Sequence, residues 1–171
     1  SISHTTRPIR NDERHGVDYY FVAPESFNGM VEKNEFMEYA KVFGQFYGTN
    51  ESTLKRQLLI GKDVALDIDW QGARKVRGVL KDCISIFILP PSLEVLKKRL
   101  IQRGDDEAQI IKRMGEAKSE IRHFEEYDYV IFNDEFEKAL LQLRAVLSAS
   151  RAETRVQKSL FEQQISELIE A

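Results

Sequence analysis

Three short apolar runs rich in β-branched and aromatic residues, each followed by a segment with helical spacing, constrain the fold of this chain most strongly. The runs are Val64–Ile68, Ile84–Leu89 and Tyr129–Phe132. Buried strands that alternate with helices are typical of a parallel sheet, because a parallel connection needs a crossover that helices usually supply. We therefore expect an α/β fold from residue 64 onward.

The first third of the chain has a different pattern, with closely spaced strands and one helix. Gly44 separates two strand-like runs at a tight turn, and Pro24 suits the first turn of a helix. This region is therefore expected to be mainly antiparallel. Its predicted strands are 2–6, 19–22, 35–43 and 45–49.

Later helix starts are marked by capping residues. Ser92 follows two prolines, and Asp106 and Asp134 each precede a Gln or Glu by three residues, as in a capping box. At the C-terminus, 154–169 carries apolar residues on one helical face. Docking on the chain's own core is the favoured interpretation of that face, and a partner helix is the alternative.

Composition limits the classes of function. The 171 residues, 42% apolar and 31% charged, are typical of one globular unit, and no apolar run reaches the length of a membrane span. A net charge of -3 disfavours a general nucleic-acid surface. The single cysteine, Cys83, excludes an internal disulfide and a cysteine-based zinc site, and no secretory signal is seen, so we expect a cytoplasmic protein.

The first ten residues predict a phosphate site. Arg7 and Arg10 lie on one short segment that also carries Ser3 and two threonines. Guanidinium groups present planar donors that match phosphate oxygens, and this spacing allows both to converge on one anion.

Two carboxylates, Asp67 and Asp69, end the apolar run that begins at Val64. Strand alternation places both on the same side, and ligands of parallel sheets bind at the carboxyl ends of strands. One carboxylate could hold Mg²⁺ through water while the other acts on a base or ribose. The alternative is that they cap the helix that starts near Gln71.

Glu38 lies in an otherwise apolar strand, and Tyr47-Gly48-Thr49 follows across the turn. A carboxylate can accept two adjacent hydrogen bonds, which matches the N1–H and N2 amine of guanine, and a hydroxyl can serve O6. Adenine lacks this pattern, so such a site would reject it. The alternative is an outward-facing strand charge.

Arginines on both sides of Gly104 suggest a mobile lid. Arg99, Arg103 and Arg113 flank this glycine, together with several lysines. A hinge between arginines is common in lids that close over polyphosphate. A solvated pair of charged helices is the alternative.

Taken in order, these motifs resemble the guanylate kinase family along nearly the whole chain. The matching motifs are Ser3-x-Thr5-Thr6-Arg7-x-x-Arg10, Gly16-x-Asp18-Tyr19, Phe36-x-Glu38, Tyr47-Gly48-Thr49, Leu66-Asp67-Ile68-Asp69-x-Gln71-Gly72, Pro90-Pro91-Ser92, Arg103-Gly104 and Asn133-Asp134. The Tyr-Gly-Thr variant is closer to the bacterial enzymes.

The resemblance implies a P-loop nucleoside monophosphate kinase fold. Such a fold has a parallel core sheet flanked by helices, an inserted mixed-sheet GMP-binding domain and a helical lid. The implied core segments are 1–7, 63–98 and 116–171, the GMP-binding domain is 8–62, and the lid is 99–115.

The resemblance also implies roles for individual residues. Ser3, Glu38, Thr49 and Asp69 would read guanine, and Arg7, Arg10, Tyr19 and Tyr47 would hold the GMP phosphate. Asp67 would support Mg²⁺ indirectly, and the ATP side would be formed by Arg99, Arg103, Arg113 and Asn133. The catalytic residues would be Arg10, Asp67, Arg103 and Arg113.

The implied activity is Mg²⁺-dependent phosphoryl transfer from ATP to GMP, giving ADP and GDP. The family's glycine-rich phosphate loop is absent from the 171 residues, so these residues alone should have little activity and the natural chain is expected to be longer. The alternative is an inactive module that binds GMP or a phosphorylated protein. GMP and ATP are the expected partners, without nucleic acid or membrane, and the sequence fits a monomer or a homodimer.

Overall fold

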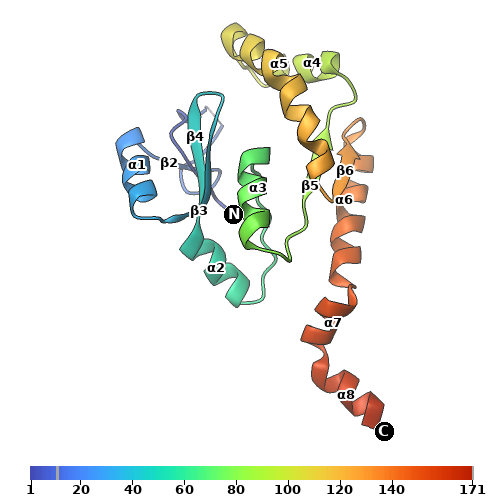
Figure 1. Cartoon of the computed structure of the whole chain (residues 1–171). Helices are drawn as coiled ribbons and strands as arrows, with labels where there is room; N and C mark the ends of the chain where they lie inside the picture. The colour runs from blue at the N-terminus through green and yellow to red at the C-terminus, as the bar shows by residue number, and fades with distance from the viewer. Residues whose placement is uncertain (11, 171) are drawn as a thin grey trace. The chain divides into compact units, whose positions relative to one another are not determined.

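Residues 1–10 and 12–170 are described by a computed structural model, in which the chain forms two units, Ser1–Cys83 and Ile84–Ala171 (Figure 1). The first unit is built on a four-stranded sheet in the order β2-β1-β4-β3. Strands β1 and β2 are parallel, whereas β4 is antiparallel to both β1 and β3. The expected mainly antiparallel region is therefore confirmed. Its strands are β1 (His4–Thr5), β2 (Tyr20–Phe21), β3 (Phe36–Val42) and β4 (Gln45–Asn50).

A two-residue turn joins β3 to β4. Phe43 and Gly44 both have positive φ angles, 50° and 91°, which is the geometry of a tight hairpin turn whose twist matches the strands. Glycine adopts this conformation without steric cost, so Gly44 makes the turn possible. The turn sets the β3–β4 register, in which Glu38 faces Thr49.

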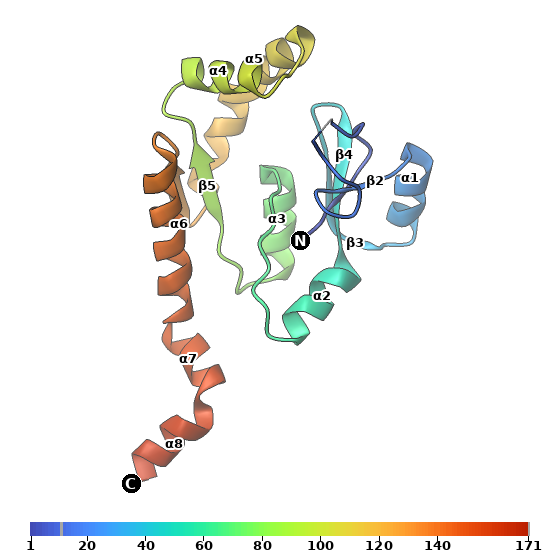
Figure 2. The ribbon, with the colours of Figure 1, turned by 180° about the vertical axis from the view of Figure 1, so that it is seen from behind.

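Helices lie on both sides of this sheet in the first unit. Figures 1 and 2 show α1 (Pro24–Glu32) on one side and α3 (Trp70–Val79) on the other. Phe27 of α1 is fully buried and its ring stacks on the rings of Phe36 and Phe46. Helix α2 (Glu51–Leu59) begins where the Asn50 side chain accepts a hydrogen bond from the Thr53 amide.

The segment Val64–Ile68 differs from the expected strand. It belongs to no strand and to no ladder of the described residues, and the ammonium group of Ser1 donates a hydrogen bond to the Ala65 carbonyl at 2.8 Å. A strand needs a hydrogen-bonded neighbour from another part of the chain, so the sequence of this segment alone cannot show that it will pair. Its apolar side chains still pack as the alternation predicts, on the buried cluster of Met37, Leu54 and Val76.

The second unit contains the parallel pair that the apolar runs predicted. Strands β5 (Ile86–Leu89) and β6 (Tyr129–Phe132) pair in parallel, with Ile86 opposite Tyr129. A crossover of helices joins them, as expected for an α/β arrangement. The crossover consists of α4 (Leu93–Gln102), α5 (Glu107–Ile121) and the 3₁₀ turn η1 (Arg122–Glu126). The helices α6 (Phe136–Arg151), α7 (Thr154–Leu160) and α8 (Glu162–Glu170) follow β6.

Two of the three predicted helix caps are confirmed. Ser92 accepts a hydrogen bond from the Val95 amide, and Asp106 accepts one from the Gln109 amide. The cap expected at Asp134 is wrong, since α6 begins at Phe136 and its N-cap residue is Glu135, which makes no side-chain cap bond. Asp134 stands one residue too early for its carboxylate to reach the first free amides of the helix.

The C-terminal region differs from the expected single docked helix. It forms two helices that meet at Phe161, and its apolar side chains are largely exposed, with Leu168 at 80%. Among the residues that the structure describes, no helix has the length and apolar character needed to cross a membrane.

Candidate functional site

The segment that carries the predicted phosphate-binding arginines is fixed to β4 by two threonines. Thr5 donates its hydroxyl to the Phe46 carbonyl at 2.9 Å and accepts the Arg7 amide at 3.1 Å. The Thr6 hydroxyl accepts the Phe46 amide at 3.0 Å. These bonds anchor the chain just before Arg7, which limits where its guanidinium can lie.

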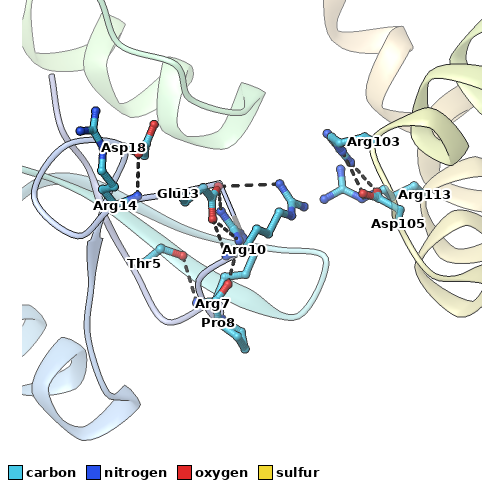
Figure 3. A network of polar contacts seen from close by, with 10 residues as sticks. All are labelled: Thr5, Arg7, Pro8, Arg10, Glu13, Arg14, Asp18, Arg103, Asp105 and Arg113. Carbon is cyan, nitrogen blue, oxygen red and sulfur yellow. Dashed lines mark hydrogen bonds and ion pairs between the residues drawn. The ribbon is translucent and has the colours of Figure 1, made fainter.

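Arg7 is held by Glu13, a residue of the loop between β1 and β2 (Figure 3). Arg7 Nη1 and Nη2 donate to the two carboxylate oxygens of Glu13 at 3.0 Å and 2.6 Å. The Arg10 amide also donates to Glu13, at 2.9 Å, and the Arg10 guanidinium lies 3.9 Å from it. Hydrogen bonding from Arg7 holds the pKa of Glu13 below its ordinary value, with burial opposing that shift.

Two tyrosines complete this group. The Arg7 guanidinium lies 5.5 Å from the centre of the Tyr19 ring, and the Tyr19 and Tyr47 rings meet edge to face at 6.0 Å. Burial raises the pKa of Tyr19, and the charge of Asp67 adds to that shift, so its hydroxyl keeps its proton. The predicted residues Arg7, Arg10, Tyr19 and Tyr47 therefore gather in one place in the first unit.

The predicted base-reading residues Glu38 and Thr49 are both buried and directly bonded. The Thr49 hydroxyl donates to Glu38 Oε1 at 2.7 Å, and their side chains belong to residues that are 3% and 0% exposed. The expectation of an outward-facing charge at Glu38 is therefore excluded. Burial raises the pKa of Glu38, the Thr49 hydrogen bond opposes that shift, and the charge of Asp69 adds to it. Ser3, a third predicted residue, is also buried.

Asp69 caps α3, as one of the two interpretations of the sequence held. Its Oδ1 accepts the Gly72 amide at 2.9 Å and its Oδ2 accepts the Gln71 side-chain amide at 3.0 Å. The charge of Asp69 raises the pKa of Glu38, and Gly72, whose amide Asp69 caps, closely approaches the Glu38 carboxylate. Capping and base recognition are thus compatible at Asp69.

Asp67 is an exposed carboxylate on the extended segment before α3. The described residues contain no group of three or more His, Cys, Asp or Glu side chains that could hold a metal ion. Mg²⁺ in kinases takes most of its ligands from water and substrate phosphates and needs only one or two carboxylates. The carboxylate of Asp67 is accessible to a water ligand, and its supporting role for Mg²⁺ stays a prediction.

Comparison with known proteins agrees with this geometry. The family model described as guanylate kinase matches residues 1–150. The chain belongs to the guanylate kinase family. A guanylate kinase of Vibrio cholerae is 51% identical over 99% of this chain and 82% of its own length. One of Vibrio vulnificus is 54% identical over 88% of this chain and 73% of its own length.

A solved structure of the guanylate kinase family supports the fold. The crystal structure of guanylate kinase from Anaplasma phagocytophilum matches with a TM-score of 0.78 and 37% sequence identity. The match covers 94% of this chain and 84% of that chain. The P-loop kinase fold that the motifs implied is therefore confirmed.

The second unit holds the lid arginines predicted for the guanylate kinase family (Figure 3). Arg103 donates through Nε and Nη2 to the two carboxylate oxygens of Asp105, and Arg113 Nε lies 3.4 Å from Asp105 Oδ2. The Asp105 side chain is 1% exposed, so it is covered by the groups that it binds. Gly104 has a φ of 83° between them, which favours glycine at this turn.

The two other predicted ATP-side residues also meet in the second unit. Arg99 Nη2 donates to the main-chain carbonyl of Asn133 at 2.8 Å and reaches the Asp134 carbonyl at 3.4 Å. The Asn133 amide donates to the Leu89 carbonyl at 2.8 Å. Arg99 thus joins α4 to the loop that follows β6.

Two residues at the site were not identified from the sequence. Glu13 sits three residues after Arg10, a spacing at which a loop carboxylate can reach the same arginines, so the charge pattern held a usable signal. Gly72 was noted only as part of a motif. An added Cβ on Gly72 would lie 2.6 Å from Glu38 Oε2, a contact that no sequence pattern reveals.

Proposed function

We propose that this protein transfers the γ-phosphoryl group of ATP to GMP, giving ADP and GDP. Membership of the guanylate kinase family supports the reaction. The buried hydrogen bond between Glu38 and Thr49 is the observation that carries the specificity for guanine. A carboxylate buried in this way needs donors, and the Watson–Crick edge of guanine offers two adjacent ones.

Four residues would read the base. Ionised Glu38 would accept hydrogen bonds from N1–H and the N2 amine, and the Ser3 hydroxyl would donate to a remaining acceptor of the base. The Thr49 hydroxyl, whose proton goes to Glu38, would hold that carboxylate in place. Asp69 would accept from the N2 side while it keeps its cap on α3. Adenine presents an acceptor at N1, so it would leave Glu38 buried without its donors.

The phosphate of GMP would bind the group formed by Arg7, Arg10, Tyr19 and Tyr47. Both arginines carry donors that suit phosphate oxygens, and the tyrosine hydroxyls can donate as well. Aromatic rings beside Arg7 exclude water from one side of its guanidinium. Such a site fixes the acceptor oxygen of GMP for attack on ATP.

The reaction forms a bond between a GMP phosphate oxygen and the γ-phosphorus of ATP. The bond from that phosphorus to the β,γ-bridging oxygen breaks, and ADP leaves with its electron pair. Arg10, Arg103 and Arg113 would stabilise the charge that spreads over the transferred group. Mg²⁺ would neutralise charge on the ATP phosphates, with Asp67 holding its water ligands. Arg99 and Asn133 would border ATP.

An inactive binding module is not favoured, because the relatives that match nearly the whole chain are named guanylate kinases. The division into core, GMP-binding and lid segments stays a prediction, as do the cytoplasmic location and a homodimer.

The proposal is tested by two measurements. With the entire natural protein, Mg²⁺, ATP and GMP, we expect equal amounts of ADP and GDP, and no product when AMP replaces GMP. In calorimetric titration, Arg10→Ala should weaken GMP binding while the far-UV circular dichroism spectrum stays unchanged. Phosphorylation of AMP at the same rate as GMP would overturn the assignment of guanine specificity, and unaltered GMP affinity of Arg10→Ala would overturn the phosphate site.

A further inference from the structure

Glu13 is a carboxylate on the phosphate side of the site, where the proposed ligand is itself an anion. Its side chain is 17% exposed, and it binds Arg7 through both oxygens and the Arg10 main chain through Oε2 (Figure 3). The Glu13 amide in turn donates to the Arg10 carbonyl at 3.1 Å. A negative group at this point either competes with the phosphate or organises the arginines for it.

The hydrogen bonds of Arg7 decide between these roles. Glu13 accepts from Nη1 and Nη2, and the Pro8 carbonyl accepts a further Nη1 bond at 2.8 Å. A guanidinium carries five N–H donors in a fixed plane. The Tyr47 side chain also forms a hydrogen bond with Arg7. The Nε–H and the second Nη2–H lie together on the edge of the guanidinium that Glu13 and Pro8 do not occupy. These two donors form a parallel pair that matches two phosphate oxygens.

The environment of Arg7 keeps this geometry in place. Its guanidinium lies 5.5 Å from the centre of the Tyr19 ring and 5.6 Å from that of the Phe21 ring. The main-chain bond from Arg10 to Glu13 fixes the carboxylate independently of Arg7. A side chain that is ordered before binding loses less conformational entropy when the ligand arrives.

We infer that Glu13 is a positioning residue for the phosphate of the nucleoside monophosphate. It stays in place when the ligand binds, and it presents the Nε and Nη2 side of Arg7 to the phosphate. This inference rests on the proposed function. It adds Glu13 to the residues that form the proposed binding site for the GMP phosphate. Loss of Glu13 therefore weakens binding of the phosphate and leaves binding of the base unchanged.

The test compares GMP with guanosine, which carries the same base and lacks the phosphate. Titration calorimetry at fixed salt concentration would measure both ligands with the unaltered protein and with Glu13→Ala and Glu13→Gln. We expect Glu13→Ala to weaken GMP binding about tenfold, as for loss of one charge-assisted contact network, and to change guanosine binding less than about twofold. The GMP affinity of Glu13→Gln should lie between those of the unaltered protein and Glu13→Ala, because the amide oxygen of the glutamine still accepts a hydrogen bond from Arg7.

A matched control is offered by Asp12, an exposed carboxylate in the same loop. Asp12→Ala removes the same charge from nearly the same place, so its GMP affinity should rise slightly or stay within about twofold. Combining Glu13→Ala with Arg7→Ala should weaken GMP binding no more than Arg7→Ala alone, because Glu13 acts through Arg7.

Each other outcome overturns the inference in a distinguishable way. Tighter GMP binding by Glu13→Ala would make Glu13 a competitor of the phosphate, and equal losses for GMP and guanosine would make its role purely structural. An unchanged affinity for both ligands would give it no role. If the unaltered protein binds neither ligand, the proposed function fails as well.

Discussion

Glu13 and Glu38 are both glutamates that contact the candidate GMP site, yet their surroundings differ in every respect. Glu13 lies in a loop, is partly exposed, and receives hydrogen bonds from two arginines. Glu38 lies in the middle of β3, is 3% exposed, and has one side-chain donor among the described residues, Thr49. Hydrogen bonding from Arg7 lowers the pKa of Glu13, whereas burial raises the pKa of Glu38.

Under the proposed function, Glu13 is a carboxylate that orients other groups of the protein, and Glu38 is one that binds the ligand. Glu13 finds its donors within the chain, so its charge is already stabilised and it can orient other groups. Glu38 is desolvated and receives hydrogen bonds from Thr49 but from no arginine or lysine side chain that the structure describes, which is costly unless a ligand supplies further donors. A buried carboxylate of this kind destabilises the free protein, and it favours binding of a ligand whose donors match it over one that lacks them.

The largest expected effect comes from Glu38→Gln. The amide keeps the size of the side chain but presents a donor where guanine also presents one, so GMP binding should weaken about 100-fold while AMP binding changes little. Titration calorimetry with both nucleotides measures this ratio. A variant that still rejects AMP as strongly as before would remove Glu38 from guanine recognition.

Gly72→Ala should act mainly on Glu38, with a weaker close contact to Ile68 Cβ at 3.3 Å. The new Cβ would stand 2.6 Å from Glu38 Oε2, so the carboxylate must move, and we expect GMP binding to weaken about tenfold with a loss of about 1–3 kcal/mol in stability. Gly78 in the same helix has no neighbouring atom within 4 Å of its added Cβ. Gly78→Ala should keep GMP affinity and gain about 0.5–1 kcal/mol. Equal behaviour of the two variants would show that the close approach to Glu38 is unimportant.

The raised pKa of Glu38 predicts a pH dependence of base binding. Guanosine is the suitable probe, because the phosphate of GMP titrates near pH 6 itself. As pH falls through the raised pKa, Glu38 gains a proton and loses its ability to accept both donors of guanine, so affinity should fall severalfold. Glu13→Gln should keep this profile and Glu38→Gln should flatten it. A flat profile in the unaltered protein would argue against an ionised Glu38 in the complex.

The smallest expected effect is a pair of opposite slopes in stability against pH. A lowered pKa means that Glu13 binds fewer protons in the folded than in the unfolded state. Its contribution to the stability of the fold is therefore fully present above its pKa in the unfolded state, and is lost as pH falls through the lowered pKa of the folded state. Glu38 binds more protons when folded, so stability declines as pH rises from its unfolded value through its raised pKa. Urea unfolding of Glu13→Gln and Glu38→Gln between about pH 2.5 and 8 should show these opposite trends. If the unfolding free energies of the two variants changed with pH in the same way, the contrast between Glu13 and Glu38 would be wrong.

Much of this architecture could be predicted from local sequence patterns. The parallel pair β5–β6, the turn at Gly44 and the caps at Ser92 and Asp106 depend on residues close together in the chain, so periodicity and capping rules identify them. The fold itself came from motif order, which the family match then confirmed.

The errors and omissions concern contacts between distant segments. Val64–Ile68 has a strand pattern, but a ladder needs a partner that the segment does not encode. Gly72 approaches Glu38, which lies 34 positions earlier in the chain (72 minus 38), and no local rule finds such a contact. The cap at Asp134 failed for a smaller reason, a shift of one residue in the start of α6.

The most direct test of the account is a calorimetric titration of the unaltered protein with GMP and with AMP at neutral pH. The buried Glu38–Thr49 pair predicts that GMP binds at least about 100-fold more tightly than AMP. Equal affinity for the two nucleotides, or binding of AMP alone, would contradict the guanine site.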